Sequence, residues 1–154
     1  MRFDYVKVID FPRHYPRERI LPWLRVGLFS KEDEVYYLLG LVDSGSDITI
    51  ITSEFASKLG ISNIAAVPKG YESEVRGVGG GKIKVYFHKV GIKIHNGSNE
   101  EPIVYKTYVG FTGTTFPSSM PQQTAILGHM GFFNLLKVTF DRPQGCFYVN
   151  PSTR

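Results

Sequence analysis

The residues Asp43-Ser44-Gly45-Ser46-Asp47 place a carboxylate directly after an apolar run that ends at Val42. A carboxylate at the end of a buried strand is costly to desolvate, so neighbouring donors must support it. Gly45 has no Cβ and lets backbone N–H groups approach the acid, and the Ser44 hydroxyl can bond between two loops. The chemistry that these residue types allow is proton transfer by Asp43. The alternative is an ordinary turn between two strands, because aspartate, serine and glycine all favour turns.

A second motif, Arg76–Lys82, is rich in glycine and lies between extended segments, which predicts a hairpin. Glycine-rich turns can also cradle phosphate, but the spacing here does not fit. A dinucleotide fingerprint that begins at Gly77 would need glycine at Lys82. A phosphate loop that ends at Gly81-Lys82 would need glycine at Arg76 and serine or threonine at Ile83. We therefore expect no nucleotide cofactor.

Other catalytic chemistries lack their motifs. Ser44 is not part of a Gly-x-Ser-x-Gly elbow. The single cysteine, Cys146, is expected to be a packed thiol. The histidines show neither HExxH nor paired-ligand spacing, so we expect no metal site. These histidines are His14, His88, His95 and His129.

The elements around the acid motif are predicted to be short strands with very little helix. Strands over 21–29 and 35–42 would form a hairpin that delivers Asp43. After residues 48–51, Thr52 or Ser53 can cap a short helix that ends at Leu59. Further extended segments are expected at 85–94, 103–111, 124–128, 138–140 and 146–149. Residues 1–20, which contain two prolines, predict an irregular N-terminal arm, and residues 21–154 predict one domain.

Composition sets limits on the kind of protein. A chain of 154 residues with 42% hydrophobic residues can bury the core of one domain. The 18 basic and 14 acidic residues give a net charge of +4, but they are scattered and match no recognised nucleic-acid motif, so we expect no nucleic-acid partner. One cysteine excludes an internal disulfide and indicates a reducing compartment. No stretch has the length of a signal peptide or a membrane span, which predicts a cytoplasmic protein without a membrane partner.

Three separated segments together resemble the retropepsins, the single-domain aspartic proteases that include the retroviral proteases and their cellular relatives. Leu41–Asp47 is similar to the catalytic loop, Arg76–Gly81 to the flap, and Ala125–Gly128 to the apolar strand and glycine behind the acid loop. The resemblance covers roughly residues 21–149. It implies an all-β fold, a closed acid-protease-type β-barrel with a flap hairpin and one or two short helices, with one lobe per chain.

The resemblance also implies an aspartic endopeptidase that is active as a homodimer. This chain has one acid loop, whereas the chemistry of the family needs two aspartates facing each other across a water, so two symmetry-related Asp43 residues would meet at a two-fold axis. Two adjacent carboxylates cannot both ionise easily and would share one proton. The ionised acid would take a proton from the water that attacks the scissile carbonyl, and its partner would protonate the carbonyl oxygen. No cofactor is needed.

The same resemblance gives roles to the remaining residues. Ser44 would reach its symmetry mate, Gly45 would offer its carbonyl to the substrate backbone, and Asp47 would contact peptide N–H groups beside the cleavage site. The substrate would be a polypeptide in extended conformation, cleaved between apolar residues. The other residues implied to contact it are Ile50, Gly77, Val78, Gly79, Gly80 and Ile126. An equally open interpretation makes the two isoleucines core residues only.

The sequence departs from the family pattern at His129-Met130, where many relatives place arginine followed by aspartate or asparagine. A protonated His129 could pair with Asp47, and the alternative is a neutral histidine that is hydrogen-bonded in a loop. The terminal strand, residues 146–149, is the candidate dimer interface by resemblance. The rival function is a catalytically silent retropepsin-fold module for dimerisation or peptide binding.

Overall fold

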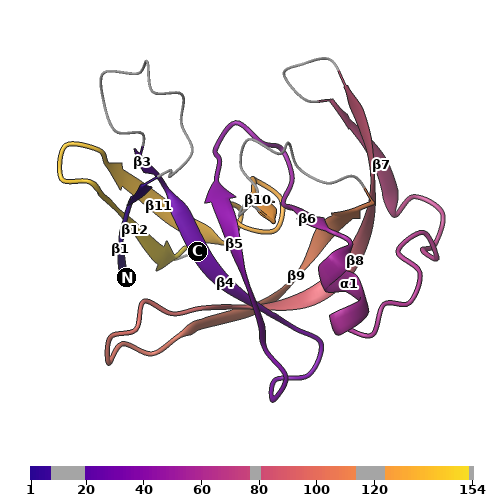
Figure 1. The fold of residues 1–154 in the computed structure, drawn as a ribbon, viewed down its shortest axis with the longest axis horizontal. Helices are drawn as coiled ribbons and strands as arrows, with labels where there is room; N and C mark the ends of the chain where they lie inside the picture. Colours follow the sequence, from indigo (N-terminus) through magenta and orange to yellow (C-terminus); the bar gives the residue numbers. More distant parts are fainter. Residues whose placement is uncertain (8–19, 77–80, 114–123, 153–154) are drawn as a thin grey trace.

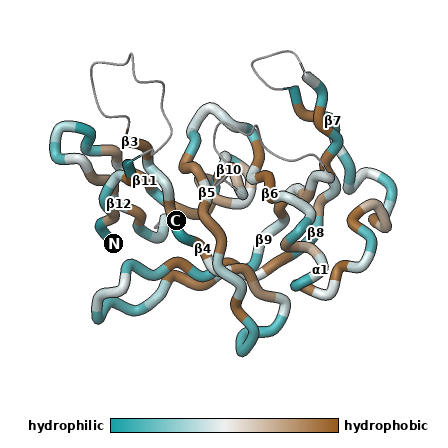
Figure 2. Tube along the Cα trace, viewed as in Figure 1, coloured by the Kyte–Doolittle hydropathy of each residue, from teal (hydrophilic) through white to brown (hydrophobic). Residues whose placement is uncertain are grey.

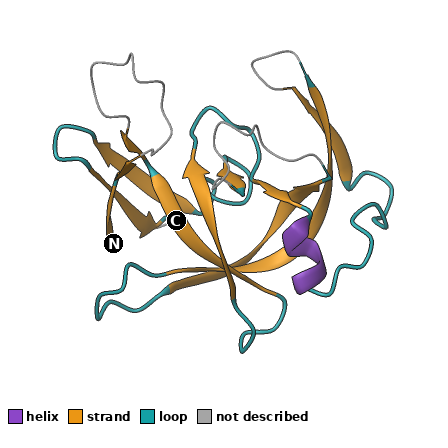
Figure 3. Cartoon of the chain, viewed as in Figure 1, coloured by secondary structure: helices purple, strands orange, loops and turns teal. Residues whose placement is uncertain are grey.

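The structure is a computed structural model that describes residues 1–7, 20–76, 81–113 and 124–152, and these residues form mostly β-strands (Figure 3). In chain order the elements are β1 (Arg2–Asp4), β2 (Val6–Lys7), β3 (Ile20–Leu21), β4 (Trp23–Phe29), β5 (Tyr36–Val42), β6 (Ile50–Thr52), α1 (Glu54–Lys58), β7 (Glu72–Arg76), β8 (Lys82–Ile94), β9 (Ile103–Thr112), β10 (Ala125–Leu127), β11 (Leu136–Asp141) and β12 (Cys146–Pro151).

Six strands close into a barrel. β4, β5, β10, β6, β9 and β8 are hydrogen-bonded in that order, and β8 pairs back with β4 (Figure 1). The β5–β10 and β6–β9 pairs are parallel, and the other pairs are antiparallel. The expected all-β class and closed barrel, with one lobe in the chain, are confirmed.

Successive side chains of a strand face opposite sides of the sheet, so alternate residues of the barrel strands point into one shared core. In β4, Leu24, Val26 and Leu28 are fully buried, and on β8 and β9 the inward residues are equally apolar. Figure 2 shows this hydrophobic colour along the barrel strands and hydrophilic colour at their connecting turns. The largest fully buried side chains include Phe29, Phe111, Phe132 and Phe147.

Helix α1 is the single helix in the described part of the chain, and it packs Phe55 and Ala56 inward. It follows Ser53, and Gly60, with a φ of +79°, comes directly after Leu59. A left-handed residue at that position suits glycine and ends the helix, as the sequence predicted. No helix in the described residues is long and apolar enough to cross a lipid bilayer.

The hairpin predicted for the glycine-rich segment is present in its two strands. β7 and β8 pair from Glu72↔Tyr86 to Arg76↔Lys82. At the upper right of Figure 1 this ladder rises away from the barrel. Residues 77–80, which contain Gly77, Val78, Gly79 and Gly80, lie outside the described residues.

A separate three-stranded sheet joins the two ends of the chain in the order β1-β12-β11. Within the segment for which the sequence predicted an irregular arm, residues 2–4 and 6–7 are strands; β2 pairs with β3, and residues 8–19 are not described. The Phe3 and Phe147 rings stack with centroids 5.5 Å apart. Because the partner of β1 lies more than 140 residues away, local sequence carried no sign of this strand.

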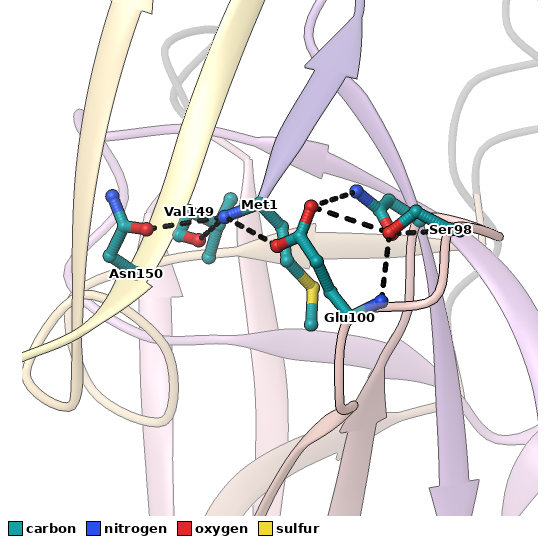
Figure 4. Close-up of polar contacts among 6 residues, drawn as sticks. Met1, Ser98, Glu100, Val149 and Asn150 are labelled. Carbon is teal, nitrogen blue, oxygen red and sulfur yellow. Dashed lines mark hydrogen bonds and ion pairs between the residues drawn. The ribbon is translucent and has the colours of Figure 1, made fainter.

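Polar contacts connect Met1, the residue before β1, with β12 and with the turn after β8 (Figure 4). The α-amino group of Met1 donates to the Val149 carbonyl at 2.9 Å and to Asn150 Oδ1 at 3.2 Å. It also lies 3.7 Å from the Glu100 carboxylate. The other oxygen of the Glu100 carboxylate accepts from Asn96 Nδ2 at 3.2 Å, so the turn holds the Glu100 side chain in place.

Phe147 should be a main support of the terminal sheet, because its ring is fully buried beside the rings of Phe3 and Tyr5. Phe147→Ala is expected to lower the free energy of unfolding by about 3–5 kcal/mol. Tyr148→Ala, at the neighbouring position on the opposite face, removes a ring that is 37% exposed and is the matched control. Urea unfolding of both variants measures the difference, and equal losses would contradict this assignment.

Candidate active site

Strand β5 leads directly into Asp43. Leu38 and Val42 point into the core and fix the strand between β4 and β10. The Asp43 N–H then donates to the Leu127 carbonyl at 3.1 Å, so the acid leaves the sheet where β10 ends. The loop over residues 43–49 begins at the tip of the β5 arrow, at the top centre of Figure 1.

The Asp43 carboxylate is half-buried, and a backbone donor supports it. Its Oδ1 accepts the Gly45 N–H at 2.9 Å. A Cβ on Gly45 would lie 3.2 Å from the same oxygen, so glycine leaves room for this close approach. Ser44 is exposed, and the Ser46 hydroxyl donates to the Ile48 carbonyl at 2.8 Å. The sequence predicted a supported acid at this position, and the loop has the geometry to support one.

The acid loop is fastened to residues 128–130 by backbone hydrogen bonds. His129 N–H donates to Ser46 O at 2.8 Å and Met130 N–H donates to Asp47 O at 2.9 Å. Gly128 lies so close to the loop that a Cβ would stand 2.4 Å from the Ile48 carbonyl oxygen. Backbone atoms cannot move aside as a flexible side chain could, so this position accepts only glycine. The order of acid loop and apolar-glycine segment read from the sequence thus corresponds to a direct contact.

Thr49 is a site residue that the sequence interpretation missed. It is fully buried, and its Oγ1 accepts the Gly128 N–H at 3.1 Å and donates to the Gly128 carbonyl at 3.4 Å. Its own N–H donates to Met130 O, and its carbonyl accepts the Gly110 N–H. The available signal was a polar residue inside the apolar run Ile48-Thr49-Ile50-Ile51, since a buried hydroxyl needs partners.

The turn over residues 128–134 forms a rigid backing for this contact. Gly131 has a φ of +94°, and its N–H donates to Asn134 Oδ1 at 3.1 Å. The Tyr105 hydroxyl donates to the Gly131 carbonyl at 3.3 Å. Burial raises the pKa of Tyr105 well above its usual value, so the phenol stays protonated and remains a donor.

His129 contacts the acid loop differently from the pairing considered in the sequence. Its Nε2 lies 2.9 Å from the Ser44 carbonyl oxygen, and its ring centroid lies 5.4 Å from that of Phe133. No ion pair joins His129 to Asp47, although both residues are within the described part of the chain. The geometry therefore favours the alternative of a histidine hydrogen-bonded in a loop.

The two candidate subsite isoleucines are direct neighbours. Ile126 of β10 pairs with Ile50 of β6 on one side and with Leu41 of β5 on the other. None of the three belongs to the main core cluster of the described residues, so this apolar row lies on the other face of the sheet. Ile126 is half-buried, whereas Ile50 is only 3% exposed. Leu41, one member of this row, is two residues before Asp43 in the chain, so the row adjoins the acid loop.

The described residues contain no group of three or more His, Cys, Asp or Glu side chains placed to hold a metal ion. The site combines a supported carboxylate with a neighbouring apolar row. The fold and the site together define an all-β barrel protein with a candidate acid–base centre.

Comparison with known proteins gave one kind of match. No protein-family model and no curated protein sequence matches the chain. Among solved structures, the chain is similar to the protease of EIAV complexed with the inhibitor HBY-793, with 18% sequence identity and a TM-score of 0.39. The match covers 79% of this chain and 88% of that chain. Because the two backbones diverge at this TM-score, the fold described above rests on the strand pairing alone.

Thr49→Val should destabilise the protein while it preserves side-chain volume. The substitution leaves the buried Gly128 N–H without its acceptor, and an unsatisfied buried donor costs about 1–3 kcal/mol. Thr139→Val, at an exposed position of β11, is the matched control and should change stability by less than about 0.5 kcal/mol. Thermal or urea unfolding measures both, and a stable Thr49→Val protein would show that the hydroxyl does not hold the contact.

Proposed function

We propose that this protein is an aspartic endopeptidase that is active as a homodimer. The observation that carries the proposal is the Asp43 carboxylate, which is half-buried at a strand end, accepts the Gly45 N–H and is fastened from behind by residues 127–130. Among the described residues, the second carboxylate oxygen, Oδ2, has no hydrogen-bond partner. A fixed acid with one free oxygen suits proton transfer to a bound water.

One such acid is half of a catalytic pair. Two copies related by a two-fold axis would bring the exposed Ser44 loops together and face Asp43 with its equivalent in the partner. The two carboxylates would share one proton, because like charges at that separation disfavour double ionisation. The ionised member would activate the water, and the protonated member would donate to the scissile carbonyl oxygen.

The substrate class follows from the apolar row. Leu41 and Ile126 are half-buried and lie side by side in the sheet next to the acid loop, where they would offer apolar surface to bulky residues of the peptide. Ile50 adjoins Ile126 and is only 3% exposed. An extended peptide would bond to the backbone of Gly45 and to Asp47, in a strand-like manner that reads little sequence. The β7–β8 hairpin would cover it, as the resemblance to a flap implies.

The terminal strand, which the resemblance makes the candidate dimer interface, is already paired within the chain. Both edges of β12 are paired within the chain, with β1 on one side and β11 on the other. A partner strand could pair with β12 only if it displaced one of these neighbours. The proposed dimer would therefore form through the loops around Asp43 and Ser44. The terminal sheet would contribute the outer edges of β1 and β11 or its faces.

Asp43→Asn should abolish peptide cleavage, with a loss of about 10²- to 10⁴-fold, because an amide cannot accept the proton of the water. The assay follows digestion of an unstructured, hydrophobic-rich protein from about pH 4 to pH 7, where a pair that shares a proton can act. Asp33→Asn, in the turn between β4 and β5, is the matched control and should cleave normally. Cleavage that persists in Asp43→Asn would refute the proposal. A native chain that dimerises without any cleavage would point to the silent binding module.

Mixing subunits tests whether two chains share one site. When native protein is incubated with a tenfold excess of Asp43→Asn protein, most native chains should pair with an inactive partner, and activity should fall to about a tenth by mass action. Excess Asp33→Asn/Asp43→Asn protein should inhibit equally, because Asp33 is remote from the site. Activity that is unchanged by the inactive chain at all concentrations would show that a single chain suffices.

A further inference from the structure

The peptide group between Ser44 and Gly45 is held at both ends. Its carbonyl oxygen lies 2.9 Å from His129 Nε2, and its N–H donates to Asp43 Oδ1, also at 2.9 Å. The carbonyl and the N–H belong to one planar unit, so a rotation of that unit moves both hydrogen bonds together. A carbonyl oxygen can only accept, so Nε2 of His129 carries the proton.

The backbone and the ring of His129 are themselves held in place. Its backbone N–H donates to Ser46 O at 2.8 Å, and its carbonyl accepts the Asn134 N–H at 2.9 Å. Its ring lies against Phe133, with the two planes at 34°. His129 is 85 residues from Ser44 in the chain, so closure of the barrel, rather than local sequence, sets where the imidazole stands.

We propose that His129 is a positioning residue that aims the Gly45 N–H at the Asp43 carboxylate through the Ser44–Gly45 peptide. The imidazole N–H, the peptide and the carboxylate form hydrogen bonds in series, and such bonds polarise one another. His129 does not touch the substrate in this scheme. The kinetic consequence rests on the proposed function, whereas the orienting contact exists whether or not the chain is an enzyme.

Two substitutions separate the effect of the His129 N–H donor from the effect of its aromatic ring. His129→Phe keeps an aromatic ring against Phe133 but has no donor, and His129→Gln keeps an N–H donor without the ring. His95→Phe is the control, because His95 also makes a ring hydrogen bond, accepting from Gly97 N–H at 3.0 Å, in the turn after β8. A thermal melt of each variant first establishes that it is folded.

The first readout is amide hydrogen exchange at Gly45, measured by NMR on the full chain. In His129→Phe the Gly45 amide should exchange about tenfold faster or more, because the peptide is free to rotate away from Asp43. His129→Gln and His95→Phe should exchange within about twofold of the native protein, the range of an unaltered bond. Unchanged exchange in folded His129→Phe would overturn the proposal, and so would equal acceleration in His129→Phe and His129→Gln.

The second readout is the division between kcat and KM. Loss of one orienting hydrogen bond should lower kcat of His129→Phe by about two- to tenfold, with KM within about twofold, and His129→Gln should recover most of kcat. A change confined to KM, or no recovery in His129→Gln, would overturn the positioning role. If the native chain cleaves nothing, the proposed function fails and the exchange experiment alone decides the role of His129.

Discussion

The close approach of two backbone segments at Gly128 is the constraint on which the rest of the site depends. The loop that follows β5 and the segment that follows β10 come together so tightly that no Cβ fits between them. The main-chain bonds from His129 and Met130 to Ser46 and Asp47 exist only because of that approach. Asp43 is consequently held by a framework formed where two parallel-paired strands end, and its orientation does not depend on long, flexible side chains.

The barrel and the terminal sheet both stabilise this arrangement, each through different contacts. The barrel, closed by the β4–β8 pairing, buries most of the apolar side chains and fixes β5, β10 and β6 as neighbours. The terminal sheet connects the first residues with the last through aromatic contacts around Phe147 and the contacts of the Met1 amino group. Both edges of β12 are paired within the chain, with β1 and with β11.

The sequence indicated the acid loop, the hairpin strands and the apolar-glycine segment, because turn residues and alternating apolar residues are local signals. Thr49 was missed because its importance comes from Gly128, which is 79 residues away. For His129 the sequence left two interpretations open, an ion pair with Asp47 and a hydrogen bond within a loop. The structure provides a hydrogen bond to a main-chain carbonyl, which no sequence pattern displays. β1 was missed for the same reason, since its strand character comes from pairing with β12.

The sequence by itself determined the class of fold, the position of the single candidate acid and the apolar character of its surroundings. These properties follow from short-range periodicity and from residue types that act within a few positions of one another. Only the tertiary structure decided which donor faces which acceptor: Thr49 on Gly128, His129 on Ser44, and β1 on β12. The physical reason is that barrel closure juxtaposes segments that are far apart in the chain, and hydrogen-bond geometry is fixed only after that closure.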